Sequence, residues 1–427
     1  MHRLTVYLRF LSILIVSLVV FSACSKDVSD AVTNKPAMSL EDKLGTQFTA
    51  VTKKHFKAPN IQKVSFPNTK DGAAMWGATG RDSEGHIYFG VSTYSDEDRT
   101  AYLYQYDPIT GQFMQQGDVL SQLKKLSIYK PGMGQSKLHS KFYQADDGYL
   151  YFSSFDEQGE STSKGVLPTY GGHMWRKKPD ALDWEHLFAT QEALIAVNTD
   201  GRYVYALGYW DHILYQYDTQ NGRINNTTVG AMTGHISRNF LVSQSGRVFV
   251  PKVEKSPDDI VTVNLHEYDS DLNLVDSHPL EHYVYNKSSQ HGIISYINMK
   301  NGDMYFVTAV GALYKIGKTS NAQHEVTFEA FLSETSDKGG YFASLFSING
   351  ENFLVSFGKL PNSKHYSWLI YETSTQTLAT YDFKNFDNKH WLYGSVTRDD
   401  LGNFYVVGVD QSIRSKHQPM ILQLSYK

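Results

Sequence analysis

The sequence predicts an all-β fold, a seven-bladed β-propeller with four antiparallel strands in each blade, and three observations support this prediction. A polar turn with a glycine, followed by a short aromatic and β-branched strand, recurs seven times. The turns are spaced by about 45 to 63 residues, which suits a four-stranded unit. No dinucleotide-binding glycine motif, phosphate-binding loop or long amphipathic helix competes with this assignment. The turn glycines are Gly85, Gly148, Gly201, Gly246, Gly302, Gly350 and Gly402.

The end of the chain predicts how the ring closes. Several units continue with a third strand that ends at an acidic turn, as in AYLYQYDPITGQ and HILYQYDTQNGR. Only 25 residues follow Gly402, too few for a complete last blade. We therefore expect the segment NIQKVSFP, residues 60–67, to supply the missing outer strand, and we place the propeller domain at residues 56–427. A pair of β-sandwiches would not give seven evenly placed hairpins.

The N-terminal region predicts export and lipid anchoring. Residues 1–23 combine basic residues with the apolar run FLSILIVSLVVFSA, which is typical of a secretory signal peptide. The end VVFSAC resembles a bacterial lipobox, which implies lipidation of Cys24, the only cysteine. Ser25 after it favours, by resemblance, the outer membrane, at the cell surface or the periplasmic face. Residues 24–55 are polar and unperiodic and are expected to form a flexible tether. An ordinary secretory peptide is the alternative.

The composition limits the classes of partner. A formal charge of −4 gives no electrostatic reason to expect nucleic acid. The 29 tyrosines suit β-structure and also surfaces that contact carbohydrate. We expect contact with a membrane only through the lipid anchor.

A propeller places a ring of candidate functional residues at one end of its channel. The innermost strand of each blade precedes the glycine turn, so its first residues, about nine to eleven positions before the glycine, lie at one rim. These positions hold Trp76, His139, Glu192, His235, His291, Tyr341 and Tyr393. The loops between second and third strands open on the same face and add Tyr170, His173, Tyr209, Trp210 and His212, with Arg238 nearby. The structural alternative is that these side chains only pack the channel or satisfy hydrogen bonds.

Histidine, tyrosine and arginine together suit proton abstraction beside a carboxylate. Arginine can pair with the carboxylate of a uronic acid and stabilise the enolate-like intermediate. Histidine or tyrosine can remove the C5 proton, and a second such group can protonate the leaving oxygen, which is a β-elimination. No GxSxG elbow or thiol is present within the predicted propeller. No pair of acidic residues is evident on this face, which argues against the two-carboxylate glycosidase scheme.

Several motifs resemble a known family. GQSKLHSKFYQADDGYLYFSS, YGGHMWR, YVYALGYWDHILYQYD and GHISRNFLVSQSGRVFVP are similar to the seven-bladed-propeller ulvan lyases, polysaccharide lyase families 24 and 25, more the latter. The resemblance covers roughly residues 70–255 by motif and the rest by repeat count. It implies a carbon–oxygen lyase that cleaves sulfated rhamnose–uronic acid polymers, with His139, His173, Tyr209 and Arg238 as catalytic residues. The 34 residues between the two histidines depart from the family's closer spacing, and the insertion GESTSKGVLPTY accounts for the difference.

The resemblance also implies how an anionic polysaccharide is held. Tyr217 is the alternative to Tyr209 as the catalytic tyrosine. Sulfate groups on the substrate would require cations nearby, and Lys137, Lys141 and Arg176 are expected to supply them. The expected substrate-binding residues are Tyr217, His235, His291, Trp76, Tyr341, Tyr393, Lys137 and Arg176. No cofactor is required for this catalysis and no metal ligand is assigned, while a structural or catalytic divalent metal stays open.

Two other functions stay open. The first is a metal-dependent enzyme resembling the oligogalacturonate lyases, in which His139, His235 and His291 would hold a divalent cation such as Mn or Zn. Activity that survives a chelator would exclude it. The second is a non-catalytic propeller, either a lipid-anchored glycan-binding protein or an assembly scaffold. A glycan-binding protein would keep the aromatic rim and tolerate loss of the histidines.

Overall fold

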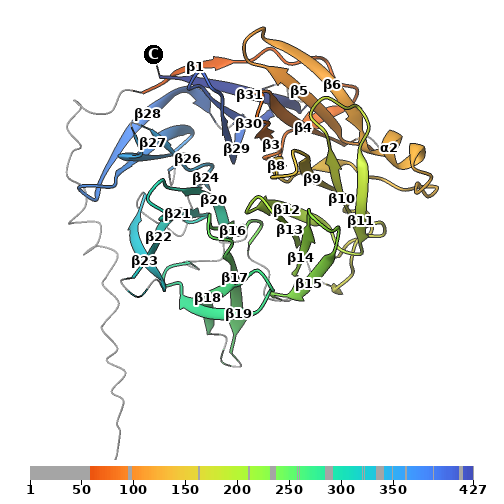
Figure 1. The fold of residues 1–427 in the computed structure, drawn as a ribbon. Helices are drawn as coiled ribbons and strands as arrows, with labels where there is room; N and C mark the ends of the chain where they lie inside the picture. Colours follow the sequence, from red (N-terminus) through yellow and green to blue (C-terminus); the bar gives the residue numbers. More distant parts are fainter. Residues whose placement is uncertain are drawn as a thin grey trace, which may run out of the picture. The chain divides into compact units, whose positions relative to one another are not determined.

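The computed structural model describes residues 58–426 apart from short gaps, and seven antiparallel sheets are formed by these residues. The gaps are residues 95–98, 162–163, 210–211, 231–236, 257, 259, 284–291, 320, 322, 333–340, 349, 361–362, 388 and 413–416. The sheets follow one another around a central axis in chain order, with their first strands nearest the axis (Figure 1). The predicted seven-bladed propeller is therefore confirmed. The proposed signal peptide, Cys24 and the tether lie outside the described residues.

The first three blades follow the predicted order of strands, from the channel outwards. Blade one has β2 (Gly72–Ala74), β3 (Thr79–Arg81), β4 (Ile87–Thr93), β5 (Tyr102–Asp107) and β6 (Gln112–Asp118). Blade two has β7 (Lys137–Leu138), β8 (Tyr143–Gln144), β9 (Leu150–Phe155), β10 (Gly172–Lys177) and β11 (Glu185–Thr190). Blade three has β12 (Leu194–Thr199), β13 (Tyr203–Gly208), β14 (Ile213–Asp218) and β15 (Ile224–Thr228). In blades one and two the inner strand is divided into two short pieces that pair with the same second strand.

The remaining blades repeat this arrangement. Blade four has β16 (Leu241–Val242), β17 (Val248–Lys255), β18 (Val261–Tyr268) and β19 (Leu274–Pro279). Blade five has β20 (Ile293–Asn298), β21 (Met304–Thr308), β22 (Ala312–Lys318) and β23 (His324–Phe331). Blade six has β24 (Tyr341–Phe342), β25 (Phe346–Ile348), β26 (Phe353–Lys359), β27 (His365–Glu372) and β28 (Thr377–Asp387). Blade seven has β29 (His390–Arg398), β30 (Phe404–Asp410), β31 (Gln418–Ser425) and, outermost, β1 (Asn60–Lys63).

Strand β1 closes the ring as the sequence predicts. It pairs antiparallel with β31, with Asn60 opposite Ser425 and Lys63 opposite Leu422. The Lys63 ammonium also contacts the Asp410 carboxylate at 2.6 Å. Because β1 comes from the start of the propeller and β31 from its end, this pairing joins the two ends of the chain.

The glycine turns have the geometry that the sequence implies. All seven turn glycines have positive φ angles, from 64° at Gly350 to 105° at Gly201. Only glycine adopts this conformation without steric cost, so each of these turns depends on its glycine. The recurrence of glycine at the turns is therefore a backbone requirement.

One short helix was not predicted. α2 (Val119–Lys125) follows β6 and begins at Asp118, whose side chain accepts a hydrogen bond from the Ser121 N–H. Val119, Leu120 and Leu123 are buried in the core between blades one and two. Seven residues are too few to give a helical period that stands out from the surrounding strands.

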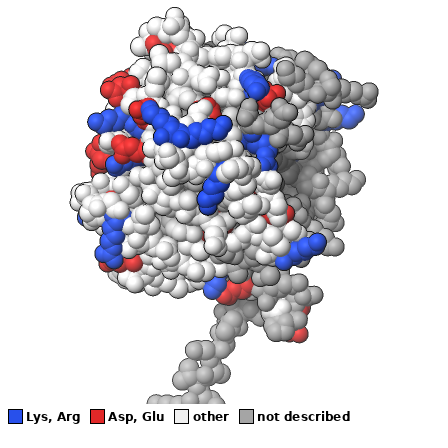
Figure 2. Space-filling model, turned by 90° about the vertical axis from the view of Figure 1, so that its right-hand side faces the viewer, with Lys and Arg blue, Asp and Glu red and all other residues white. Residues whose placement is uncertain are grey.

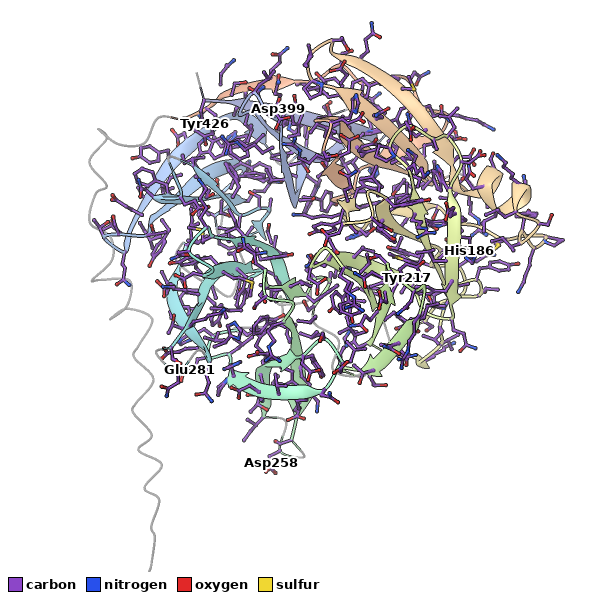
Figure 3. All side chains as sticks on the ribbon, viewed as in Figure 1. His186, Tyr217, Asp258, Glu281, Asp399 and Tyr426 are labelled. Atoms are coloured by element: carbon purple, nitrogen blue, oxygen red, sulfur yellow. The ribbon has the colours of Figure 1, made fainter. Side chains whose placement is uncertain are left out.

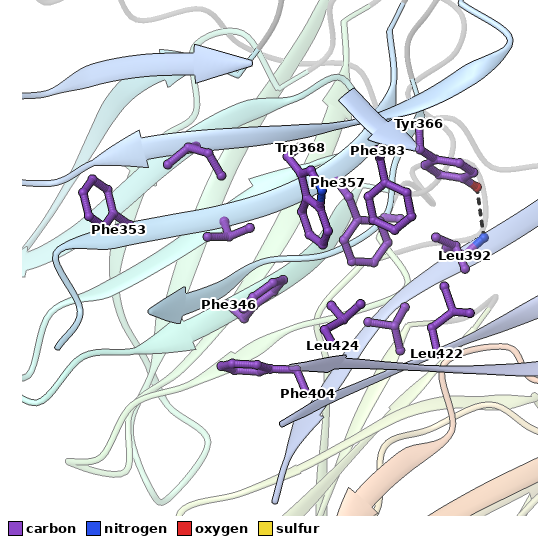
Figure 4. Packing of buried hydrophobic residues seen from close by; sticks show 14 of the residues in the cluster. Phe346, Phe353, Phe357, Tyr366, Trp368, Phe383, Leu392, Phe404, Leu422 and Leu424 are labelled. Carbon is purple, nitrogen blue, oxygen red and sulfur yellow. Dashed lines mark hydrogen bonds between the residues drawn. The ribbon is translucent and has the colours of Figure 1, made fainter. Parts of the chain in front are cut away.

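The core lies between neighbouring sheets, where aromatic side chains from facing strands interlock. Figure 4 shows this packing between blades six and seven, where Phe346 of blade six lies 4.7 Å from Phe404 of blade seven between ring centroids. The Tyr366 hydroxyl accepts a hydrogen bond of 3.0 Å from the Leu392 N–H, which ties the two blades together. Large rings on alternate strand positions fill the wedge-shaped gaps between blades.

A hydrogen-bonded network recurs in three blades and gives three of the tyrosines a structural role. In each, a tyrosine of the second strand donates to an aspartate of the glycine turn, and a glutamine directly opposite on the third strand donates to the tyrosine oxygen. The distances lie between 2.9 and 3.4 Å. The three sets are Asp82–Tyr88–Gln105, Asp200–Tyr205–Gln216 and Asp399–Tyr405–Gln423; Asp399 is labelled in Figure 3.

Blade two contains a variant of this network. Tyr151 donates to Asp147 at 2.6 Å, and Arg176 lies opposite Tyr151 where the other blades have glutamine. The Arg176 guanidinium donates to the Tyr151 oxygen at 3.5 Å and to Glu185 at 2.8 Å. Arg176 is therefore part of the framework that holds the turn to the third strand.

The surface carries charges of both signs. Figure 2 shows basic and acidic residues interspersed on the face drawn, without a broad area of one sign. This distribution agrees with the small net charge of −4. In the described part of the chain, no helix is long and apolar enough to cross a membrane.

We predict that Tyr405→Phe destabilises the protein by about 1–2 kcal/mol, because Asp399 is buried and loses a hydrogen-bond donor. Chemical denaturation measures the change. Tyr203→Phe is the matched control, because that ring lies over the Arg202 guanidinium at the edge of blade three and not in the network. Equal stability of Tyr405→Phe and the wild type would contradict a stabilising network.

A second prediction concerns acid stability and His173, which is buried beside His186 and Trp175. Burial, helped by the nearby positive charges of His186 and Lys130, lowers the pKa of His173 to about 3. An unfolded histidine binds its proton near pH 6.5, so the unfolded state gains protons first as the pH falls. At pH 5 this residue alone should cost about 2 kcal/mol of stability.

His173→Gln should therefore lose less stability than the wild type between pH 7 and pH 5, measured by thermal unfolding. His365→Gln, at an exposed position, is the control and should follow the wild type. Parallel curves for all three proteins would show that His173 does not contribute to the acid sensitivity.

Candidate functional site

The inner strand region of blade two lines the channel with alternate residues. Lys137, His139, Lys141 and Tyr143 line open space, whereas the residues between them, Leu138, Ser140 and Phe142, are buried in the blade. Successive side chains of an extended chain point to opposite sides, so one short segment supplies four channel residues. The sequence KLHSKFY thus runs along the channel wall.

Two hollows that share lining residues lie along this wall of the channel, and together we call them the channel site. The inner chamber encloses about 830 Å³, including space open to solvent, and the outer chamber about 800 Å³. Trp76, His139 and Arg238 line both. The inner chamber is also lined by Lys141, Tyr143, Asn198, Asn239, Tyr296, Tyr393 and Ser395, and the outer chamber by Tyr94, Lys137, Phe155, Glu157, Glu160, Ile195 and Tyr209.

Arg238 and Tyr209 form the central contact of the channel site. The Arg238 Nη2 donates to the Tyr209 hydroxyl at 2.8 Å, and the guanidinium lies 5.3 Å from the ring centroid. The neighbouring Asn239 fixes the Arg238 segment by donating to the Ile293 and Ile294 carbonyls at 3.0 and 3.2 Å. The Tyr209 N–H donates to the Ala193 carbonyl at 2.8 Å, which fixes the tyrosine at the end of β13.

Arg238 retains capacity to bind an anion. It makes no ion pair with a described residue, and its Nε is buried without a hydrogen-bond partner among them. A buried guanidinium donor without an acceptor is costly unless a ligand supplies one. The channel site therefore presents a donor that a carboxylate or sulfate oxygen can satisfy.

Tyr209 holds its proton at neutral pH. Burial raises the pKa of the Tyr209 phenol, and the Arg238 charge only partly opposes this effect. The phenol is therefore a proton donor in the ligand-free protein.

Aromatic rings surround His139 and Arg238. The Trp76 ring meets Tyr393 edge to face at 4.9 Å and Tyr94 at 6.1 Å, and His139 lies 6.1 Å from Phe155 between ring centroids. Such rings offer flat apolar faces on which sugar rings can stack. Trp76, Tyr393 and His139 thus occupy the rim positions that the sequence predicts.

The charges of the channel site are mixed. Lys137 contacts Glu157 at 2.5 Å and lies 5.6 Å from the centroid of the Trp76 ring. Burial lowers the pKa of Lys141 to about 8. Glu157 and Glu160 both line the outer chamber, so the expectation that no pair of acidic residues lies on this face is wrong. They belong to the segment after β9, where Glu157 lies just before the insertion GESTSKGVLPTY and Glu160 lies within it, and the repeat pattern does not position this insertion.

Three predicted site residues are not part of the channel site. His173, Arg176 and Tyr217 lie on third strands, β10 and β14, two strands away from the channel lining in their blades. Figure 3 shows His186, the hydrogen-bond partner of His173 at 2.9 Å, towards the outside of blade two. The prediction that they share one crevice with His139 is wrong, because the loop before the third strand reaches the rim but the strand itself runs through the blade.

The environments of these three residues are structural. His173 stacks on Trp175, and Tyr217 packs against Tyr151 at 6.0 Å. Arg176 is engaged by Glu185 at 2.7 Å and by Asp147 at 3.6 Å. None of them lines the channel site.

The other rim residues divide into two groups. Glu192 and His212 are buried in blade three, and the Tyr170 hydroxyl donates to the Pro131 carbonyl, so none of these lines the channel site. Trp210, His235, His291 and the side chain of Tyr341 lie outside the described residues.

Sequence reasoning missed the deeper part of the inner chamber. Asn198 donates a hydrogen bond to the Tyr296 hydroxyl, and burial, together with the nearby Tyr296 phenol, raises the pKa of the Tyr143 phenol. In each inner strand these residues come a few positions after the rim position, which was found by counting back from the turn glycine. Continuing the count by two residues at a time from His139 and Glu192 would have found Tyr143 and Asn198. Tyr296 falls outside such a count because the register of β20 shifts between Ile293 and Ser295.

Among the described residues, one group of side chains has metal-ligand geometry, Glu267, Asp276 and His278 in blade four. It does not belong to the channel site. The metal-dependent alternative relied on His139 together with His235 and His291, and the last two lie outside the described part of the chain. That alternative stays a prediction.

Comparisons with known proteins support the fold. No protein-family model and no curated protein sequence matches the chain. The β-propeller domain of Cps50 (Swd1) from Myceliophteria thermophila is similar in structure, with a TM-score of 0.53 and 8% identity over 84% of this chain and 99% of that chain. A fungal alcohol oxidase of the AA5 family in complex with copper has a TM-score of 0.52 and 8% identity over 86% of this chain and 76% of its own. These similarities show that the chain has a β-propeller fold.

Proposed function

We propose that the protein is a polysaccharide lyase that cleaves a uronic-acid-containing polysaccharide, of the sulfated ulvan type, by β-elimination. The observation that carries this proposal is the contact between Arg238 and Tyr209 on a chamber wall shared with His139. A carboxylate binder, a phenol that holds its proton and an imidazole then face one space. These are the groups that elimination beside a carboxylate requires.

Arg238 is proposed to bind the uronate carboxylate. Its unsatisfied Nε and its Nη2 offer the parallel donors that a carboxylate accepts in a bidentate pair. This pairing withdraws negative charge and makes the C5 hydrogen more acidic. It also stabilises the enolate-like intermediate, in which the charge on the carboxylate increases.

His139 and Tyr209 are proposed as the base and the acid. His139 removes the C5 proton, the electron pair forms the C4–C5 double bond, and the bond from C4 to the glycosidic oxygen breaks. Tyr209, whose raised pKa keeps it protonated, donates its proton to the leaving oxygen. The phenolate is stabilised by the adjacent Arg238 until it regains a proton from water.

The remaining channel residues suit an anionic polymer. Trp76 and Tyr393 provide stacking faces in the inner chamber, and Lys141 and Lys137 provide cations that suit sulfate or carboxylate groups of neighbouring sugars. Glu157 neutralises Lys137 in the ligand-free protein, so a sulfate would have to compete for that lysine. This reaction requires no cofactor, and the lipid anchor at Cys24 would hold the enzyme at the outer membrane.

We predict that Tyr209→Phe and Arg238→Ala each reduce lyase activity by about 10²- to 10³-fold, because each removes a group that acts in the transition state. His139→Ala should have a similar effect. The measurement is the absorbance of the conjugated C4–C5 double bond on a panel of ulvan, pectate, alginate and glycosaminoglycans. Tyr217→Phe is the matched control, because that tyrosine is also buried in blade three but does not line the channel site.

The panel separates the proposal from its competitors. If the Tyr209→Phe and Arg238→Ala variants were as active as the wild type, the assigned roles would be contradicted. Release of reducing ends without the double bond would indicate hydrolysis, for which Glu157 and Glu160 would be the carboxylates to test. Binding to one polysaccharide without any cleavage would support the glycan-binding alternative.

We expect activity to survive treatment with a chelator at a temperature well below the unfolding transition, since no step uses a metal ion. Loss of activity at this temperature, restored by Mn²⁺ or Zn²⁺, would favour the metal-dependent alternative. Circular dichroism recorded on the chelated protein checks that the fold is intact.

A further inference from the structure

We propose that Glu267, Asp276 and His278 form a zinc site at the outer part of blade four, where it faces blade five. The three side chains project from adjacent strands, Glu267 from β18 and Asp276 and His278 from β19. One ligand atom from each lies within 4.8 Å of the others. None of them lines the channel site, so the inference does not depend on the proposed function.

The strand register explains why these residues share one face. Glu267 lies directly opposite Asp276, and His278 follows Asp276 by two positions. Directly opposite residues on an antiparallel pair lie on the same face, as do residues two apart on one strand. The sequence DSH at 276–278 therefore places a carboxylate and an imidazole beside the buried Glu267.

Blade four departs from the repeated network at this position. Glu267 lies opposite Phe249, where blades one, three and seven pair a glutamine with a tyrosine. Phe249 has no hydroxyl, so Glu267 on the third strand lacks the hydrogen-bond partner that a tyrosine provides in the other blades. In its place a carboxylate that is 4% exposed faces imidazoles. A buried carboxylate needs a compensating cation or donors.

The distances between the ligand atoms also suit a metal ion. His278 Nε2 makes a long hydrogen bond of 3.4 Å with Glu267 Oε2 and lies 3.9 Å from Asp276 Oδ2. Both atoms of the long hydrogen bond could instead bind one metal ion placed between them. Two ligands bound to tetrahedral zinc at about 2.0–2.2 Å are separated by about 3.4 Å. The Glu267–His278 pair already has this separation, and half-exposed Asp276 needs to move only slightly.

Further contacts hold the Glu267 carboxylate in place. Its Oε1 accepts a hydrogen bond from His324 Nδ1 of blade five at 3.0 Å and forms an ion pair with Arg247 Nε at 3.4 Å, whereas Oε2 contacts His278. Hydrogen bonds to the free oxygen of a ligating carboxylate orient it for the metal. His324 thereby links the site to the neighbouring blade.

The ligand set favours zinc among the common divalent cations. An imidazole with two carboxylates and an open fourth position for water is a zinc-type set, whereas calcium and magnesium prefer oxygen ligands alone. Two carboxylates neutralise the charge of the ion. The site would stabilise the contact between blades four and five.

Isothermal titration of the chelator-treated protein with ZnCl₂ tests the proposal. We expect one zinc per chain with a dissociation constant in the micromolar range or below, and a higher unfolding temperature with zinc. Titration with Co²⁺ should give the visible absorption of a tetrahedral ion. His278→Gln should weaken binding at least 100-fold, and His324→Gln by about 10- to 100-fold.

His266→Gln is the matched control. His266 precedes Glu267 on β18, and its side chain points to the other face, where it contacts the Tyr268 hydroxyl at 3.5 Å. This variant should bind zinc like the wild type. Binding only at millimolar zinc, or equal affinities for His278→Gln and His266→Gln, would overturn the proposal.

A measurement on the wild type covers the case in which His278→Gln does not fold. Zinc should protect His278 from modification by diethylpyrocarbonate, mapped by mass spectrometry, and should leave the modification of the exposed His365 unchanged. Equal modification of His278 with and without zinc would also overturn the proposal.

Discussion

Closure of the ring by strand β1 is the constraint on which the channel site depends. Four residues of β1 pair with the last strand of the chain, and Thr79 and Arg81 of blade one contact Thr397 and Asp400 of blade seven across the same seam. Trp76 and Tyr393 lie on either side of this seam and meet at 4.9 Å. One wall of the channel site is therefore assembled from the two ends of the propeller.

Strand register then decides which residues face the channel and which face the framework. Inner strands place every second side chain in the channel, as Lys137, His139 and Lys141 show. Third-strand positions opposite a second-strand tyrosine instead belong to buried networks. Gln105, Gln216 and Gln423 take this place in three blades, and Arg176 takes it in blade two. A residue on an inner strand can therefore face the channel, whereas a residue of the same type on a third strand is part of the buried framework.

This division explains how far the sequence predicts the protein. Repeats of glycine turns were sufficient for seven blades, because positive φ is a local requirement. Closure by residues 60–63 could be predicted because the last blade lacked residues for its outer strand. Counting from the turns also placed Trp76, His139 and Tyr393 correctly. His173, Arg176 and Tyr217 were misplaced because their strand position depends on loop lengths that the motifs do not determine. Glu157 and Glu160 were missed because they belong to a segment outside the repeat.

The charges of the channel site set the demands on its ligand. Arg238 has an unsatisfied buried donor, whereas Lys137 is already paired with Glu157. An anionic group is therefore expected first at Arg238, next to Tyr209 and His139. The most direct measurement is a crystal structure of the His139→Ala variant with a uronic acid oligosaccharide. The account predicts a carboxylate hydrogen-bonded to Arg238, with the glycosidic oxygen of the scissile bond near the Tyr209 hydroxyl. An oligosaccharide bound elsewhere, with Arg238 still engaged only by Tyr209, would contradict it.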